Sequence, residues 1–219
     1  MCGRYSITSN FEAVRRLFDL PGPAPNWWQA RYNLAPTQEA PVVRLRDGRR
    51  ELAALRWGLI PFWAKDEKIA YQTINAKAET VASKPAFRAA FKARRCLVAT
   101  DGFYEWQKLP AGKQPWRIVM ADRGPFGLAG LWESWGPPEK RLETFTIVTT
   151  DANALCAPIH DRMPVIVDPA DFAAWLEARP GSEALLRPFP AGRMTAYKVG
   201  AAVGAVRNQG PELIEPLAP

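Results

Sequence analysis

The sequence is poor in the residues that build metal sites and disulfide frameworks. It contains a single histidine and three cysteines, Cys2, Cys96 and Cys156, which form no CxxC pair. An odd number of widely spaced cysteines supports neither a disulfide framework nor a zinc site. We therefore expect reduced thiols, no metal and no cofactor.

Long apolar runs and long runs of one charge are also missing. No stretch approaches the roughly 18 apolar residues that cross a bilayer, and the first residues do not resemble a signal peptide. We therefore expect a cytoplasmic protein with no membrane partner. The absence of a long basic run also argues against a disordered basic tail.

The sequence does contain a surplus of positive charge. Its 219 residues carry a formal net charge of +7, and they include 9 Trp and 21 Pro. This balance favours a polyanionic partner, nucleic acid first, and a solvated surface rich in Lys and Arg is the alternative interpretation. The length suits a single domain over 1–219, and the sequence shows no repeat and no convincing linker. We expect the tail at about 209–219 to be extended.

Strands outnumber helices in the predicted structure. Runs rich in β-branched and aromatic residues predict strands within 41–61, with a hairpin turn at Asp47–Gly48, and again within 95–106. We expect an α+β fold of curved, barrel-like antiparallel sheets flanked by a few short helices. Further strands are predicted at 115–120, 127–132, 143–150 and 163–167.

Three helices are predicted, at 9–22, 83–95 and 168–178. Ser9 and Glu12 would form a capping box for the first. Ser83 would cap the second, with Pro85 in its first turn, and Asp168 would cap the third, with Pro169 at its first position.

Cys2 follows the initiator methionine, where a cysteine has chemistry that an internal one lacks. If Met1 is removed, the chain begins with an α-amine and a thiol on adjacent carbons. An aldehyde can form an imine with the amine, and the thiol can then close a five-membered thiazolidine. The nearby Arg4 should lower the pKa of both groups. The alternative is that Met1 stays and Cys2 simply begins a strand.

Three other residues stand in contexts that suit proton transfer or orientation. His160 lies between two prolines just before a predicted strand, which suits a proton-transfer group, and a surface or core role is the alternative. Glu105 alternates with aromatic residues, so it either points into a pocket with a raised pKa or faces solvent. Asn75 can orient a hydroxyl or carbonyl, or serve as a turn residue.

Aromatic and cationic residues are interleaved in three segments. Trp63 stands beside Lys65, Lys77 follows in the next segment, and further cations lie within 88–95. This interleaving is typical of a groove for single-stranded nucleic acid, in which cations bind phosphates and rings stack on bases. Each residue alone is equally consistent with core or solvated surface.

Taken together, these segments resemble the SRAP family, the abasic-site processing proteins of bacteria and eukaryotes. Each matching stretch is modest alone, but the ordered set is highly specific. The C-terminal stretches YKVG and VRNQGPELIEP are also family-like but less diagnostic. The matching stretches run from residue 1 to about 167 and read MCGRYS, RYNLAPTQ, RWGLIPFWAKD, INAKAET, RRCLVATDGFYEW, AGLWE, FTIVTTDAN and IHDRMPVI.

The resemblance implies a DNA-repair protein of the SOS response that senses abasic sites in single-stranded DNA. It implies a covalent thiazolidine between Cys2 and the ring-opened aldehyde, which shields the lesion, in a monomeric protein that acts at the nucleoid. By resemblance, Asn75 positions the sugar or the N-terminus, Glu105 assists proton transfer at the amine, and His160 assists opening of the sugar. The resemblance also places along the DNA groove Arg4, Trp63, Lys77, Trp106, Thr149 and Arg162.

Two features of the family bear on these expectations. Its usual NARAET motif reads NAKAET here, so Lys77 keeps the charge but loses the planar guanidinium fork, which should weaken phosphate binding and leave catalysis unaffected. The family is also classed as a peptidase, because removal of Met1 was attributed to the protein itself, and it is associated with abasic-site lyase activity.

Two other classes of function remain open at this point. Amidohydrolases of the glutamine amidotransferase type also begin with MCG, but they need a glutamine-binding segment that is not found here. A non-covalent single-strand binding module would use Trp63 and the cations alone, and it would leave Cys2 and His160 without roles. Glutaminase activity would identify the first class. The absence of a DNA adduct that resists denaturation would identify the second.

Overall fold

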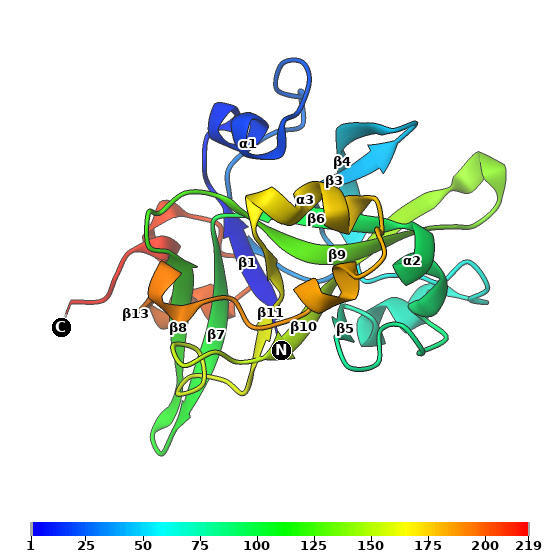
Figure 1. The fold of residues 1–219 in the computed structure, drawn as a ribbon. Helices are drawn as coiled ribbons and strands as arrows, with labels where there is room; N and C mark the ends of the chain where they lie inside the picture. Colours follow the sequence, from blue (N-terminus) through cyan, green and yellow to red (C-terminus); the bar gives the residue numbers. More distant parts are fainter. Residues whose placement is uncertain (1, 219) are drawn as a thin grey trace.

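The strands form two sheets, and the larger sheet closes on itself (Figure 1). The computed structural model describes residues 2–218. The expected α+β class with barrel-like, mainly antiparallel sheets is confirmed, and among the described strands only the pairings of β10 with β4 and β5 are parallel. Pairing runs in a ring through β10 (Leu142–Asp151), β4 (Arg49–Trp57), β3 (Glu39–Arg46), β6 (Arg95–Thr100) and β9 (Phe126–Trp135) and returns to β10, with β5 (Asn75–Lys77), β11 (Arg162–Pro164) and β12 (Ile166–Val167) attached.

The second sheet is antiparallel and carries the beginning of the chain. Its short first strand lies between two partners and therefore has no free edge. The order is β13 (Met194–Lys198), β8 (Gly112–Met120), β7 (Gly102–Leu109), β1 (Arg4–Ile7) and β2 (Arg31–Leu34).

The tight turn between β3 and β4 was predicted correctly. Asp47 and Gly48 have φ of 51° and 75°. A type I′ hairpin needs positive φ at both central residues, which Asp-Gly tolerates.

The helices are short, and two of their predicted starts were wrong. Helix α1 spans Phe11–Phe18, and its cap is Asn10, whose Oδ1 accepts from the Ala13 N–H at 2.9 Å. Ser9 is not the cap, because its N–H and hydroxyl donate to Asp101. Glu12 does not form the expected capping box, and pairs with Arg15.

Helix α2 spans Arg88–Ala93, so the predicted cap Ser83 and first-turn Pro85 lie in turns ahead of it. Asp168 was placed correctly, since its Oδ1 accepts from Ala170 N–H. The remaining helices are α3 (Phe172–Leu176) and short 3₁₀ turns at Glu67–Gln72, Pro138–Lys140, Pro169–Asp171, Ser182–Leu185, Ala191–Arg193, Ala201–Gly204 and Pro211–Ile214.

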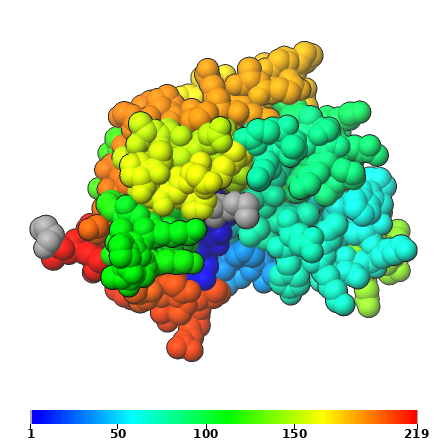
Figure 2. Space-filling model, turned by 90° about the horizontal axis from the view of Figure 1, so that it is seen from below, coloured from blue at the N-terminus to red at the C-terminus, as the bar shows by residue number. Residues whose placement is uncertain are grey.

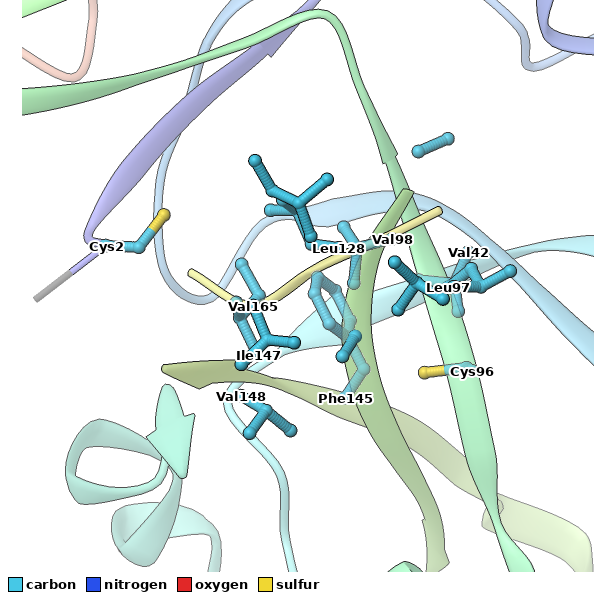
Figure 3. Packing of buried hydrophobic residues seen from close by; sticks show 14 of the residues in the cluster. Cys2, Val42, Cys96, Leu97, Val98, Leu128, Phe145, Ile147, Val148 and Val165 are labelled. Atoms are coloured by element: carbon cyan, nitrogen blue, oxygen red, sulfur yellow. The ribbon is translucent and has the colours of Figure 1, made fainter. Parts of the chain in front are cut away.

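The main core joins the barrel to the second sheet. One cluster of buried residues includes Cys2 and Tyr5 as well as barrel residues such as Leu97 and Ile147. Figure 3 shows Cys2 at the beginning of β1, at the margin of this cluster. The first described residue of the chain is therefore part of the core.

The chain passes from the barrel to the second sheet at Asp101, between β6 and β7. Its buried carboxylate accepts from Ser6 Oγ at 2.7 Å, from Thr8 Oγ1 at 2.7 Å and from Arg117 Nη2 at 2.9 Å. Burial alone would raise the pKa of Asp101, but these hydrogen bonds and the charge of Arg117 hold it below its ordinary value. This corner fixes the carboxyl end of β1.

The C-terminal segment returns to the second sheet. The part of 209–219 that was expected to be extended contains the 3₁₀ turn Pro211–Ile214, and Leu213 is buried against Tyr104, Val199 and Val203. Within residues 2–218, no helix is long and apolar enough to span a bilayer.

Candidate active site

Cys2 lies two residues ahead of the first residue of β1, beside the strand that carries Glu105. Strand β1 runs antiparallel to β7, with Arg4 opposite Tyr104 and Tyr5 opposite Phe103. Glu105 is the next residue after Tyr104, so this register directs the beginning of the chain toward it. The electrostatic influence of Glu105 on the Cys2 thiol agrees with this placement.

Burial controls the protonation of the Cys2 thiol. The residue is fully buried, and desolvation, with a smaller contribution from the charge of Glu105, raises the pKa of the thiol far above its ordinary value. Arg4 was expected to lower this pKa through its charge; a backbone hydrogen bond with Arg4 does lower it, but desolvation is the larger effect and the net shift is upward. The Arg4 guanidinium instead donates to Asn33 Oδ1 and to the Val203 carbonyl, each at 2.8 Å. The thiol is therefore protonated at neutral pH and needs a base before it can react.

Glu105 is suited to be that base. Its side chain is buried on β7, and burial, together with the negative charge of Asp161, raises the pKa of its carboxyl to about 7. A carboxyl with a pKa near 7 is present in both protonation states at neutral pH and can both accept and return a proton. Burial and a raised pKa thus agree with the first interpretation of Glu105, and the solvent-facing alternative does not fit.

His160 lies at the end of a compact turn that reaches the same region. Its backbone N–H donates to the Cys156 carbonyl at 2.9 Å, and burial raises the pKa of the Cys156 thiol to about 12, with Glu105 adding to the effect. His160 and Trp106 line one shallow pocket of about 350 Å³. Cys156 is thus a neighbour of the candidate site, and no motif in the sequence pointed to it.

The His160 ring makes two contacts that require different protonation states. Its Nδ1 accepts from the Arg162 backbone N–H at 3.0 Å, and it also lies 2.9 Å from Asp161 Oδ1. The first contact needs an unprotonated Nδ1 and the second a protonated one. Burial lowers the pKa of His160, and Asp161 is largely exposed and can turn into water. The neutral ring, with its proton on Nε2, is therefore the form at neutral pH.

Asn75, Lys77 and Thr149 lie on adjacent parallel strands. Asn75 is opposite Ile147 and Lys77 is opposite Thr149 in the β5–β10 pairing. The buried Asn75 Oδ1 and Thr149 Oγ1 have no hydrogen-bond partner within residues 2–218, and Asn75 Nδ2 makes only a long contact of 3.5 Å to the Ile147 carbonyl. Two buried oxygens on neighbouring strands can therefore accept hydrogen bonds from a ligand.

Arg162 is held by the protein rather than extended into solvent. Its Nη1 and Nη2 donate to Glu79 at 2.6 and 3.0 Å, Nη1 donates to Asp151 at 2.7 Å, and Nη2 donates to the Thr149 carbonyl at 2.8 Å. Two carboxylates thus compensate its charge. Arg162 braces β11 against β10, which the sequence did not indicate.

The predicted groove residues differ in exposure. Trp63 is 49% exposed and Lys77 is exposed, as expected of groove residues, whereas Trp106 is half-buried with the Arg4 guanidinium 6.0 Å from its ring centre. Figure 2 shows the blue N-terminal strand in the middle of one face, bordered by the yellow segment near 150–162, the cyan segment near 60–75 and the green β7–β8 hairpin. Within residues 2–218, no cluster of His, Cys, Asp and Glu could hold a metal ion.

The raised pKa of Glu105 makes a prediction about stability. The folded protein binds the Glu105 proton more tightly than the unfolded chain does. The free energy of unfolding therefore falls as pH rises from 4.5, the ordinary pKa of the carboxyl, through about 7. Glu105→Gln removes the titration. As pH rises from 5 to 8, the free energy of unfolding of the variant should increase relative to that of the parent by up to about 3 kcal/mol.

Urea unfolding at pH 5 and pH 8 measures this change. Glu139→Gln, at an exposed position, is the control and should show no such pH dependence. A stability difference between the Glu105 variant and the parent that is equal at both pH values would contradict the raised pKa.

Comparisons with known proteins identify the family of the chain. The family model described as SOS response associated peptidase (SRAP) matches residues 1–206. The chain is 42% identical over 222 residues to the abasic site processing protein YoqW of Bacillus subtilis, covering 98% of this chain and 99% of the relative. It is 32% identical over 229 residues to the abasic site processing protein YedK of Escherichia coli, covering 99% and 100%.

Relatives beyond bacteria and solved structures extend the match. The abasic site processing protein HMCES of Xenopus tropicalis is 33% identical over 258 residues, covering 97% of this chain and 77% of the relative. A crystal structure of a protein from Bacteroides thetaiotaomicron matches with a TM-score of 0.86 at 28% identity, covering 99% and 100%. The chain belongs to the SOS response associated peptidase (SRAP) family.

Proposed function

We propose that this protein binds abasic sites in single-stranded DNA and attaches itself covalently to the lesion through Cys2. The observation that carries the proposal is the placement of the Cys2 thiol, buried ahead of β1, under the influence of a carboxyl whose pKa is about 7. The names of the curated relatives support the abasic site as the substrate. The covalent adduct shields the lesion. The protein is cytoplasmic and acts at the nucleoid.

The chemistry requires a free α-amine at Cys2, and hence the loss of Met1, which lies outside the described residues. The amine nitrogen attacks the aldehyde carbon of the ring-opened sugar, and loss of one water gives an imine. The Cys2 sulfur then forms a bond to the imine carbon while its proton moves to the nitrogen. The product is a five-membered thiazolidine, and the net reaction releases one water.

Glu105 supplies the proton transfers that this sequence needs. Because the buried thiol is protonated at neutral pH, ring closure requires a group that takes its proton and delivers one to nitrogen. Asn75 Oδ1 accepts a hydrogen bond from the sugar or the amine. His160 Nε2–H donates to the sugar oxygen as the ring opens, since Nδ1 is occupied by the Arg162 N–H.

DNA binding uses the face at whose centre the N-terminal strand is visible in Figure 2. The exposed Trp63 ring provides a stacking surface, and Lys77 provides a charge for phosphate. Trp106 lines the pocket that also contains His160, and the buried Thr149 Oγ1 offers an acceptor to a group that enters beside Lys77. Arg4 and Arg162 act mainly by holding β1 and β11 in place, because their guanidinium groups already donate to protein oxygens.

Substitutions of Cys2 test the proposed attachment. Cys2→Ala should give no adduct that survives denaturing electrophoresis after mixing with abasic single-stranded DNA, although its amine should form an imine that borohydride traps. Cys2→Ser should give a labile adduct, because oxygen closes a less stable ring than sulfur. Cys96→Ala, at a buried cysteine of the barrel, is the control and should crosslink as the parent does.

Crosslinking by Cys2→Ala at the level of the parent would rule out the thiazolidine. A parent protein that binds abasic DNA but leaves no denaturation-resistant adduct would identify a non-covalent binding module. Glutaminase activity that is lost in Cys2→Ala would instead support an amidohydrolase.

The roles of Glu105 and His160 predict slower crosslinking without weaker binding. Glu105→Gln should lower the crosslinking rate by about 10²- to 10⁴-fold, and His160→Gln should fall at the lower end of this range because the sugar also opens spontaneously. For the parent, the rate should rise as pH increases through about 7, as Glu105 becomes able to accept the thiol proton. Single-turnover rates from pH 5 to pH 8.5 measure both effects, and an unchanged rate in Glu105→Gln would contradict its role.

A further inference from the structure

Two family-like stretches without a role in the proposed chemistry meet beside β1. One is 31–38, which includes β2, and the other is 206–216 near the C-terminus. After β13, residues 201–209, which include the beginning of the second stretch, form a loop, named here the C-terminal loop, which folds back onto β1 and β2.

Asn33 holds this loop by its main chain. The residue is fully buried on β2, and the two hydrogens of its Nδ2 are shared among the carbonyls of Val203, Ala205 and Asn208, each 3.1 Å from the nitrogen. Its Oδ1 accepts from Arg4 Nη1 at 2.8 Å. One amide thus links an irregular loop to the strand that carries Cys2.

Arg4 and Gln209 complete the attachment. The Arg4 guanidinium donates to the Val203 carbonyl at 2.8 Å and to the Gly204 carbonyl at 3.1 Å. Gln209 Nε2 donates to the Asn33 carbonyl at 2.9 Å and to the Val206 carbonyl at 3.1 Å. Side chains therefore satisfy the carbonyls that an irregular loop would otherwise turn to water, so the loop is ordered before any ligand binds.

The outer residues of this ordered loop are free to meet a ligand. Val206 is 42% exposed and Arg207 is exposed. In Figure 2 the orange-red segment protrudes on the same face as the blue N-terminal strand, on the side opposite the yellow segment near 150–162. The loop thus borders the approach to Cys2 on one side only.

We propose that the C-terminal loop contacts the nucleotides that flank the abasic site on one side, with Arg207 at a phosphate and Val206 against a sugar or base. An apolar side chain beside a cation matches the alternation of bases and phosphates, and apolar residues pack against nucleic-acid bases in other complexes. Because the staple formed by Arg4, Asn33 and Gln209 has already ordered the loop, binding does not have to order it. The inference rests on the proposed function, since it takes the same DNA as the partner.

The test uses single-stranded oligonucleotides with a tetrahydrofuran abasic analogue, which has no aldehyde and binds without crosslinking. One oligonucleotide extends only to the 5′ side of the analogue, and a second extends only to the 3′ side. Val206→Ser and Arg207→Ala should each weaken binding about three- to tenfold for one of these two oligonucleotides and leave the other unchanged. Arg207→Ala should also lower the salt slope for that oligonucleotide by about 0.7, as expected for one phosphate contact.

Leu217→Ser and Arg46→Ala are matched controls, because these side chains are 47% and 64% exposed and lie outside the loop. Asn33→Asp removes the amide donors while retaining an acceptor for Arg4, and it should weaken binding of the same oligonucleotide. Loop variants that bind both DNAs as the controls do, or that weaken both equally, would overturn the inference. The proposed function fails separately, if the parent protein does not crosslink to a true abasic site.

Discussion

The antiparallel pairing of β1 with β7 is the interaction on which the rest of the site depends. Strand β1 is only four residues long, Arg4–Ile7, and it lies between β7 and β2. Asp101 fixes its carboxyl end through Ser6, Thr8 and Arg117. A short strand held on both sides and at one end can present its first residues in a fixed place, which a free N-terminus could not do.

Desolvation is the main cause of the pKa shifts at this site, and the neighbouring carboxyl groups add to it. Burial raises the pKa of the Cys2 and Cys156 thiols and of the Glu105 carboxyl. The net charge of +7, which favours the negatively charged form of each group, does not reverse this effect. The same effect that makes the thiol a poor nucleophile at neutral pH makes the carboxyl a competent base there. A protonated thiol is also less easily oxidised than a thiolate, so burial protects the nucleophile until substrate arrives.

The sequence predicted the elements whose signals are local. The Asp47–Gly48 turn and the Asp168 cap depend on neighbouring residues, and both were found as expected. The prediction of Ser9 as the cap of α1 was wrong, because Ser9 donates to Asp101, a residue far away in sequence. The resemblance could name Arg4 and Arg162, but their partners, the carbonyl of Val203 and the carboxylate of Glu79, come from segments that only the fold brings together.

The central claim is that Cys2 reacts through both its amine and its thiol. Intact mass spectrometry of the protein after reaction with a short abasic oligonucleotide tests it most directly. The account predicts an adduct whose mass equals the protein without Met1 plus the DNA minus one water, stable without reduction. An adduct that retains Met1, or one that forms at full yield without loss of water, would contradict it.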